Sequence, residues 1–438
     1  MFSLRILLFF CIVLTCKCEN YTQLCYDNKQ FKNVNNLIKI EKAATLSAAK
    51  HIRENGYPVE IHEVTTDDGY ILSMQRIPHG LTNKRRDNAQ PVLILHGLGS
   101  SSEPLTIEFI YMLANKGYDV WLGNLRSSFE NTRHIHYSQS QSKFWKFGLD
   151  EIGLIDTPAM IDYILNTTKQ TQLSAVISMS LSTISTSIML TVKPELNHKV
   201  SRHVAIAPIV HLDYSVSLTV YGIKVIAAIG FPDILFEALC KLYLPLVPIL
   251  CSPFGIMPLC HINSLVVYGY SPGNYGACVG IIGAVASRGL SIQTLRHLYQ
   301  IITKKQLMRY DYGVKENLKR YGTETPPIVD VGKITTPTSL VYSANDPLAT
   351  PLNVALLARK MKTAKVVLLE DTMINHVDYF AAALFDNAVM KRVNRVILEN
   401  IRLADIKENI KNNVENCIMK YQPVLKIKIF SYYMSVTP

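Results

Sequence analysis

The chain has 438 residues, 48% of them hydrophobic, and a formal net charge of +11. A chain of this length forms two or three domains, or one large domain that carries an insertion. Its basic residues are scattered, with no zinc-finger spacing and no aromatic-basic RNA signature, so the sequence favours a solvated basic surface over a nucleic-acid partner.

The first residues contain an arginine and a short apolar run, Ile6 to Thr15. This run is too short to span a bilayer and polar residues follow it, so residues 1–18 are predicted to be a secretory signal peptide. The mature chain is expected to be secreted, with the lysosome as the alternative, and to contain no transmembrane segment. The sequons at Asn20 and Asn166 are candidate glycosylation sites in such a compartment.

Six cysteines remain after this cleavage, and an oxidising compartment favours disulfides among them. They are Cys25, Cys240, Cys251, Cys260, Cys278 and Cys417. The sequence does not choose among their many pairings. Cys251 and Cys260, with two prolines between them, form the best local pair.

Apolar and polar residues alternate from Tyr57, and Asp67-Asp68-Gly69 interrupts the alternation, which predicts a β-hairpin. Further along, apolar strands alternate with helices, which predicts a mostly parallel sheet with helices on both faces. Strands are expected at residues 91–97, 118–124, 173–178 and 203–208, and helices at residues 106–116, at 150–166 and after Leu181.

This alternation stops at about residue 209 and resumes at residue 336. Strands are then expected at 336–346 and 364–371, and helices at 353–362 and 380–401. The interruption includes a stretch, Leu242 to Ser287, without one Asp, Glu, Lys or Arg. Because five prolines would break any long helix there, we expect an apolar, loop-rich cap over a binding site and not a transmembrane helix.

A nucleophilic serine requires an imidazole base, a carboxylate that orients this base, and donors for the oxyanion. Ser180 ends one predicted strand, Asp346 ends another, and His376 follows the last strand. This chain order and the strand-end positions are typical of hydrolases with a strand-to-helix nucleophile turn. Ser180, Asp346 and His376 are the predicted triad. Asp378 is a rival acid without the strand-end position.

Two backbone amides are the predicted oxyanion donors. Gly97 allows a tight turn after the first buried strand, so that the Leu98 amide points into the site. The Leu181 amide directly follows the nucleophile and is the second donor.

The chain resembles the acid lipase family of α/β-hydrolases, which includes gastric and lysosomal acid lipases and many secreted insect lipases. The resemblance rests on six blocks in order: "GYPVEIHEVTTDDGYILSMQRIPHG", "VLILHGLGSSS", "YDVWLGNLRSS", "FWKFGLDEIGLIDTPAMIDYIL", "SANDPLATP" and "NHVDYFAA". It extends from about residue 38 to residue 401.

The resemblance implies an α/β-hydrolase fold with an inserted, mainly helical cap, hydrolysis of lipid esters at a lipid–water interface, and no metal or organic cofactor. By position it implies the same triad, the same oxyanion amides and a cap disulfide between Cys251 and Cys260. The expected regions are a lipase-associated region at 38–105, a hydrolase core at 91–209 and 336–401, a cap at 210–335 and a C-terminal extension at 402–438. The sequence does not indicate an oligomeric state.

Three serines stand where this family has glycines, at Ser178, Ser182 and Ser127. Two of them flank the nucleophile, whose backbone is expected to be strained, and each adds a side chain. Two hypotheses therefore remain: an active lipase of acylglycerols or related esters, of triacylglycerol or sterol ester type, and a catalytically impaired lipid-binding or storage protein of the same fold. The Gly-rich segment Ala277 to Gly289 and the C-terminal tail also depart from the family pattern.

Overall fold

The computed structural model describes residues 47–82, 89–105, 108–128, 132–228, 266–269, 291–369, 374–379 and 387–402. Several predicted features lie outside these residues: the signal peptide at 1–18, Asn20, all six cysteines including Cys251 and Cys260, the segment 277–289, and all of the C-terminal extension after residue 402.

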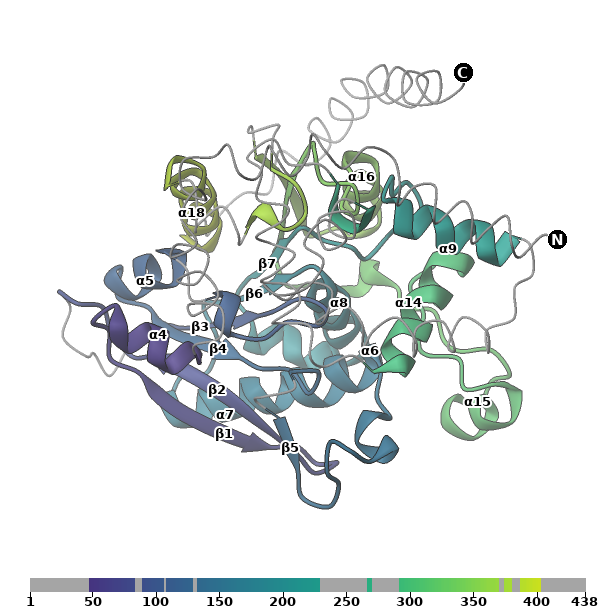
Figure 1. The fold of residues 1–438 in the computed structure, drawn as a ribbon, viewed down its shortest axis with the longest axis horizontal. Helices are drawn as coiled ribbons and strands as arrows, with labels where there is room; N and C mark the ends of the chain where they lie inside the picture. The colour runs from purple at the N-terminus through teal and green to yellow at the C-terminus, as the bar shows by residue number, and fades with distance from the viewer. Residues whose placement is uncertain are drawn as a thin grey trace, which may run out of the picture.

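The described residues form a nine-stranded mixed sheet with the strand order β1-β2-β4-β3-β6-β7-β8-β9, and β5 pairs with β2 (Figure 1). The pairs of β2 with β1, β4 and β5 are antiparallel, and all others are parallel. The strands are β1 (Glu60–Thr65), β2 (Tyr70–Ile77), β3 (Pro91–Leu95), β4 (Asp119–Gly123), β5 (Thr132–His134), β6 (Ala175–Met179), β7 (His203–Ile206), β8 (Thr338–Ser343) and β9 (Ala364–Leu369). The predicted sheet is therefore confirmed.

The predicted β-hairpin is formed by β1 and β2. Gly69 has a φ of 93°, a conformation that favours glycine, and its amide donates a hydrogen bond to the carbonyl of Thr66. The Thr66 hydroxyl accepts a hydrogen bond from the amide of Tyr70. Thr66 therefore accepts hydrogen bonds from two successive backbone amides of the turn.

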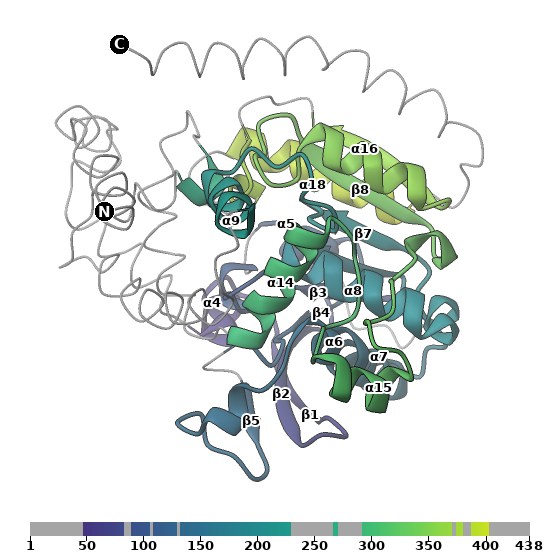
Figure 2. The same ribbon diagram turned by 90° about the vertical axis from the view of Figure 1, so that its right-hand side faces the viewer.

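Helices cover both faces of the sheet, as the sequence predicts (Figures 1 and 2). On one face α5 packs against α18, and on the other α7 packs against α8, while α16 packs against β8 and β9. These helices are α5 (Glu108–Asn115), α7 (Thr157–Thr168), α8 (Leu181–Val192), α16 (Pro351–Lys360) and α18 (Asn387–Arg402). Short 3-10 helices lie at Glu103–Leu105, Ser142–Trp145, Pro194–Lys199 and Val331–Lys333.

The helix expected at residues 150–166 has three parts. A turn of α-helix, α6 (Leu149–Glu151), continues as a π-helix over Ile152–Asp156 and then as α7. Gly153 lies in the π-helical part, where a Cβ atom would stand 2.4 Å from the carbonyl oxygen of Ser185. Glycine is therefore required for the backbone of this helix to approach α8.

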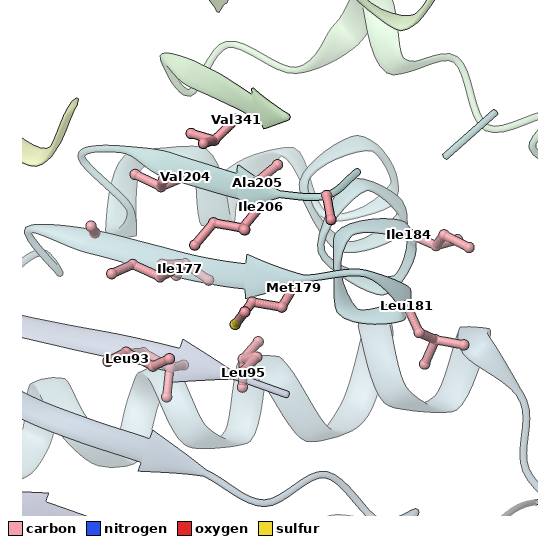
Figure 3. Close-up of a cluster of buried hydrophobic side chains, with 14 of the residues drawn as sticks. Leu93, Leu95, Ile177, Met179, Leu181, Ile184, Val204, Ala205, Ile206 and Val341 are labelled. Carbon is pink, nitrogen blue, oxygen red and sulfur yellow. The ribbon is translucent and has the colours of Figure 1, made fainter. Parts of the chain in front are cut away.

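The strand that leads to the nucleophile lies in the buried core. Every residue of β3, β6, β7 and β8 is buried. Figure 3 shows the apolar side chains of these strands packed side by side, with Leu181 and Ile184 projecting from α8. Parallel strands covered on both faces are predominantly apolar, as these are. Each buried Leu or Ile stabilises the fold by about 1.5–3 kcal/mol, so this core holds the end of β6 in place.

The predicted insertion at 210–335 is described only in part. Its described residues include α9 (Leu218–Ala228), which packs against α14 (Ile292–Lys304), and α15 (Val314–Tyr321). Because residues 229–265 and 270–290 lie outside the described part, a complete cap stays a prediction. One further helix, α4 (Ala48–Glu54), precedes the hairpin. No helix of the described residues is long and apolar enough to span a membrane.

Candidate active site

Ser180 stands on the sharp turn between β6 and α8, as predicted. Its backbone has a φ of 51° and a ψ of −116°, a conformation that L-residues rarely adopt. Such a residue costs on the order of 1–3 kcal/mol, and it persists only where the surroundings fix it. The Ser180 amide donates to the carbonyl of Ile206 over 3.0 Å, and its carbonyl accepts from the amide of Thr183 over 2.9 Å. These bonds hold the side chain of Ser180 at the end of the strand.

The structure brings the three residues of the predicted triad together. Ser180 Oγ lies 2.8 Å from His376 Nε2, and His376 Nδ1 lies 3.0 Å and 2.9 Å from the two carboxylate oxygens of Asp346. His376 and Asp346 are both buried. Because a carboxylate only accepts hydrogen bonds, Nδ1 carries the imidazole proton, and Nε2 is free to accept the proton of the Ser180 hydroxyl. The arrangement is that of a nucleophile, a base and an orienting acid.

Asp346 is held by its own loop. The amides of Leu348 and Ala349 both donate to Oδ1 over 2.9 Å. The rival acid, Asp378, has a different role, because its Oδ2 accepts a hydrogen bond from the amide of Asn375 over 2.8 Å. Asp378 therefore shapes the turn that carries His376, and Asp346 is the carboxylate that contacts the imidazole.

The structure describes the surroundings of both predicted oxyanion donors, whose role stays a prediction. Leu181 is the first residue of α8, so its amide is among those that a helix leaves without an internal acceptor. Leu98 follows Gly97, where a Cβ atom would stand 3.3 Å from Ser180 Cβ. This close approach places the segment that leads to Leu98 against the nucleophile.

The two serines that flank the nucleophile in place of family glycines have hydrogen-bond partners. Ser182 Oγ accepts from the amide of Met179 over 2.7 Å, and it lies 2.9 Å and 3.1 Å from the carbonyl oxygens of Met179 and Leu95. Ser178 Oγ lies 2.6 Å from His203 Nε2. Ser182 therefore ties the nucleophile turn to β3, and Ser178 ties β6 to β7.

Ser178 and His203 do not form a second catalytic pair. His203 is buried, and no acceptor or donor among the described residues contacts its Nδ1. Burial lowers the pKa of His203 to about 3, so the ring stays neutral. A base without an orienting carboxylate, closed off from solvent, cannot accept a proton during a reaction. Ser127 is also buried, and its hydroxyl has no partner among the described residues.

Comparisons with known proteins show the family of this chain. A family profile described as a partial alpha/beta-hydrolase lipase region matches residues 48–106, and one described as the alpha/beta hydrolase fold matches residues 90–222. Gastric triacylglycerol lipase of Rattus norvegicus is 31% identical over 356 residues, which cover 77% of this chain and 88% of the relative. Lipase 1 of Drosophila melanogaster is 30% identical over 375 residues, which cover 82% and 81%. The chain belongs to the acid lipase family of α/β-hydrolases.

Membership of the acid lipase family makes the chain a carboxylic ester hydrolase of the lipase type. Among solved structures, the acetyl esterase MekB is 14% identical with a TM-score of 0.50, and the match covers 81% of this chain and 99% of that chain. At this level of identity the likeness shows the fold alone.

A short segment from the insertion reaches the site of this acid lipase. The ring of Tyr268 is parallel to the imidazole of His376, with ring centroids 6.0 Å apart. Asn375 Nδ2 donates to the carbonyl of Gly269 over 3.0 Å, and Ser217 Oγ donates to the carbonyl of Val267 over 2.8 Å. The sequence prediction missed these contacts. Only the position of Asn375 beside His376 could have indicated one of them.

Asn166, the described glycosylation candidate, is exposed near the end of α7. The threonine of its sequon, Thr168, is mostly buried, and its hydroxyl donates to the carbonyl of Ile164 over 2.8 Å. Glycosylation at Asn166 stays a prediction.

Proposed function

We propose that this protein is a lipase that hydrolyses carboxylic esters of lipids, acylglycerols or related esters, with Ser180 as nucleophile, His376 as base and Asp346 as orienting acid. The continuous chain of hydrogen bonds from Ser180 through His376 to Asp346 carries this proposal. It is supported by the left-handed backbone of Ser180, which projects the nucleophile from a strained turn.

The reaction follows from the position of each atom. Ser180 Oγ attacks the acyl carbonyl of the ester, and His376 Nε2 takes the hydroxyl proton as the new C–O bond forms. The tetrahedral intermediate then collapses, the alcohol leaves with the proton from His376, and an acyl-enzyme remains. Water attacks this acyl-enzyme with the same base, and the fatty acid is released. Asp346 stabilises the imidazolium in both steps.

The negative charge on the former carbonyl oxygen requires fixed donors. We assign these to the amides of Leu181, the residue after the nucleophile, and of Leu98, the residue after Gly97, which approaches Ser180. Losing one oxyanion donor in a hydrolase of this kind costs about 10²–10³ in turnover. Backbone donors are fixed before the substrate binds, so they need no reorganisation during the reaction.

The alternative function is a lipid-binding or storage protein that has lost catalysis. Its only support is the replacement of glycines by Ser178 and Ser182. Since both hydroxyls have hydrogen-bond partners and the distance from Ser180 to His376 is short, catalysis is favoured. The experiment is turnover of short-chain and long-chain esters by the purified protein beside Ser180→Ala. Lipid binding with no turnover by either protein would support the alternative.

Lipid ester substrates form surfaces, and we propose that the face next to the loop of Asp346 and Pro347 contacts them. Five of the twelve exposed large hydrophobic residues of the described chain lie within one stretch of 12 residues. They are Tyr214, Val216, Leu218, Tyr221 and Val225, exposed by 43–54%. Ser215 Oγ and the Val216 amide both donate to the carbonyl of Pro347, over 2.8 Å and 2.9 Å. The stretch is therefore fixed beside Asp346.

Replacing two of these side chains tests this surface. Tyr221→Ser with Val225→Ser removes apolar area from one face of α9, and loss of about 1.4 kcal/mol of surface binding corresponds to a tenfold change. We expect turnover of emulsified long-chain triacylglycerol to fall about tenfold or more, with turnover of a soluble short-chain ester unchanged. If the variant turned over the emulsified triacylglycerol as fast as the wild type does, this face would not be the one that contacts the lipid surface.

We also propose that the protein enters the secretory pathway through a signal peptide at residues 1–18, is glycosylated at Asn20 and Asn166, and carries a Cys251–Cys260 disulfide. Sequencing of the mature N-terminus, a mass shift on enzymatic removal of N-glycans, and non-reducing peptide mapping test the three features separately. An uncleaved N-terminus on protein from a secreting cell would contradict the first.

A further inference from the structure

His96 is a buried histidine that the catalytic assignment does not use. It lies between the end of β3 and the loop of Leu98, and its side chain is fully shielded from solvent. Its Nε2 accepts a hydrogen bond from the amide of Leu125 over 3.1 Å, and its Nδ1 lies 2.9 Å from the carbonyl oxygen of Gly97. Both ring nitrogens are therefore satisfied by backbone groups.

These two contacts fix the protonation of the ring. A backbone amide only donates, so Nε2 must be the unprotonated nitrogen. A carbonyl oxygen only accepts, so Nδ1 must carry the proton and donate it to Gly97. Burial lowers the pKa of His96 to about 4, and the neutral ring with this single tautomer is the form at neutral pH.

The bond to Gly97 acts on the Leu98 amide through the geometry of the peptide bond. The carbonyl of Gly97 and the N–H of Leu98 belong to the same planar unit, and in a trans peptide they point in opposite directions. The described chain has no cis peptide bond. Holding the Gly97 carbonyl on the side of His96 therefore directs the Leu98 N–H to the opposite side of this peptide.

The anchor of this contact is itself rigid. The Leu125 carbonyl accepts from the amide of Ser128 over 2.8 Å. The neighbouring Asn124 accepts from the amide of Ser102 over 2.8 Å and donates to the carbonyl of Ser73 over 3.2 Å. The loop after β4 is thus tied to β2 and to the segment after β3, so the position of His96 Nε2 is well defined.

We propose that His96 is a positioning residue for the oxyanion hole: by donating from Nδ1 to the Gly97 carbonyl, it sets the direction of the Leu98 N–H. This inference rests on the proposed function, since it requires Leu98 to be an oxyanion donor. His96 does not touch the substrate, and its effect is on the transition state, where the oxyanion forms.

Two substitutions, each of which reproduces the position of one ring nitrogen, separate the two contacts of the ring. In His96→Asn the side-chain amide reaches the position of Nδ1 and restores the donor to Gly97, but it does not reach Leu125. In His96→Gln the amide reaches the position of Nε2 and restores the acceptor for Leu125, but it leaves the Gly97 carbonyl without its donor. Both variants keep a polar side chain, but His96→Asn is shorter by one methylene and leaves the larger gap. A purely structural role of His96 therefore predicts an equal or larger loss of activity in His96→Asn than in His96→Gln.

The experiment compares kcat and KM on a soluble ester for the wild type, His96→Asn, His96→Gln and Ser180→Ala, with thermal unfolding of each. We expect His96→Gln to lower kcat about 10-fold to 100-fold, part of the loss seen when a donor is removed, at unchanged KM. His96→Asn should recover most of this kcat. A boronic acid that forms a tetrahedral adduct with Ser180 should bind His96→Gln more weakly than the wild type, by a factor similar to the loss of kcat.

Three outcomes decide the matter. The proposal is supported if His96→Gln loses kcat, His96→Asn recovers it, and the unfolding temperatures of the two variants do not follow the same order as their kcat values. A kcat of His96→Asn no higher than that of His96→Gln, or boronic acid affinity unchanged in His96→Gln, overturns it while leaving the lipase assignment intact. Wild-type turnover no higher than that of Ser180→Ala overturns the proposed function, and this inference with it.

Discussion

At the scale of single residues, the choice between two carboxylates is the sharpest test of the site. Asp346→Asn keeps the shape of the side chain but removes the charge that fixes the tautomer of His376, so turnover should fall by about 10⁴ with folding intact. Asp378→Asn keeps an oxygen acceptor for the Asn375 amide and should lower turnover far less. Steady-state kinetics with circular dichroism measures both, and the reverse order would make Asp378 the orienting acid.

The serines beside the nucleophile give a second residue-scale prediction. Ser182→Gly leaves the amide of Met179 without its acceptor, and Ser178→Gly leaves His203 Nε2 without a partner. Unpaired buried polar groups cost about 1–3 kcal/mol each. The double variant should therefore unfold at a lower temperature and show no gain in kcat. Faster turnover by the double variant would mean that the two side chains crowd the nucleophile turn.

The meeting of Ser180, Asp346 and His376 could be predicted because their signal is local. Each stands at the carboxyl end of a strand, and the order along the chain is typical of the fold. The supporting contacts could not be predicted in the same way. Asn375 and Gly269 are 106 positions apart, and the contact from His96 to Leu125 depends on the register of β3 against β4. Neither contact leaves a periodic pattern in the sequence.

At the scale of helices and strands, the hairpin and the alternating core were predictable because hydrophobic periodicity reports burial directly. The π-helix at Ile152–Asp156 was not, because the approach of Ser185 to Gly153 that accompanies it is a contact with another helix. The three-residue strand β5 is too short to show alternation, and it depends on pairing with β2.

The contact at Gly153 yields a prediction with a matched control. In Gly153→Ala the new Cβ would stand 2.4 Å from the Ser185 carbonyl, so α8 must shift, at a cost of about 1–3 kcal/mol. In Gly222→Ala, on α9, the new Cβ has no heavy atom within 4 Å, and alanine favours the helix by up to about 1 kcal/mol. Urea unfolding should show a loss of stability for the first variant only. Equal stability of the two variants would show that α8 moves freely against the π-helix.

At the scale of the whole molecule, buried histidines make stability depend on pH. Burial lowers the pKa of His297, and it lowers those of His96 and His203 further. Burial lowers the pKa of His96 to about 4 and of His203 to about 3, against an ordinary value of about 6.5. As the pH falls from about 6.5 toward these values, the unfolded chain binds protons that the folded chain does not. The stability that these groups contribute is therefore complete above about pH 6.5, and each group loses about 1.4 kcal/mol per pH unit below it.

Part of this dependence can be assigned to one of these groups, His203. Replacing both members of the pair, Ser178→Ala with His203→Leu, removes the titrating ring without leaving the other polar group alone. Urea unfolding at a series of pH values gives the free energy of unfolding as a function of pH. Between pH 4 and pH 6 its slope should be smaller in the double variant by about 1.4 kcal/mol per pH unit, which corresponds to one proton. An unchanged slope would mean that His203 is protonated in the folded protein as readily as in the unfolded one.

The central claim is that Ser180 is the nucleophile of an acid lipase, and covalent labelling tests it most directly. The whole purified protein is treated with a fluorophosphonate, and the modified residue is located by mass spectrometry. Our account predicts one phosphonyl group per chain on Ser180, loss of ester turnover in proportion to labelling, and no labelling of Ser180→Ala. Equal labelling of the wild type and Ser180→Ala, or modification at Ser178 in place of Ser180, would contradict it.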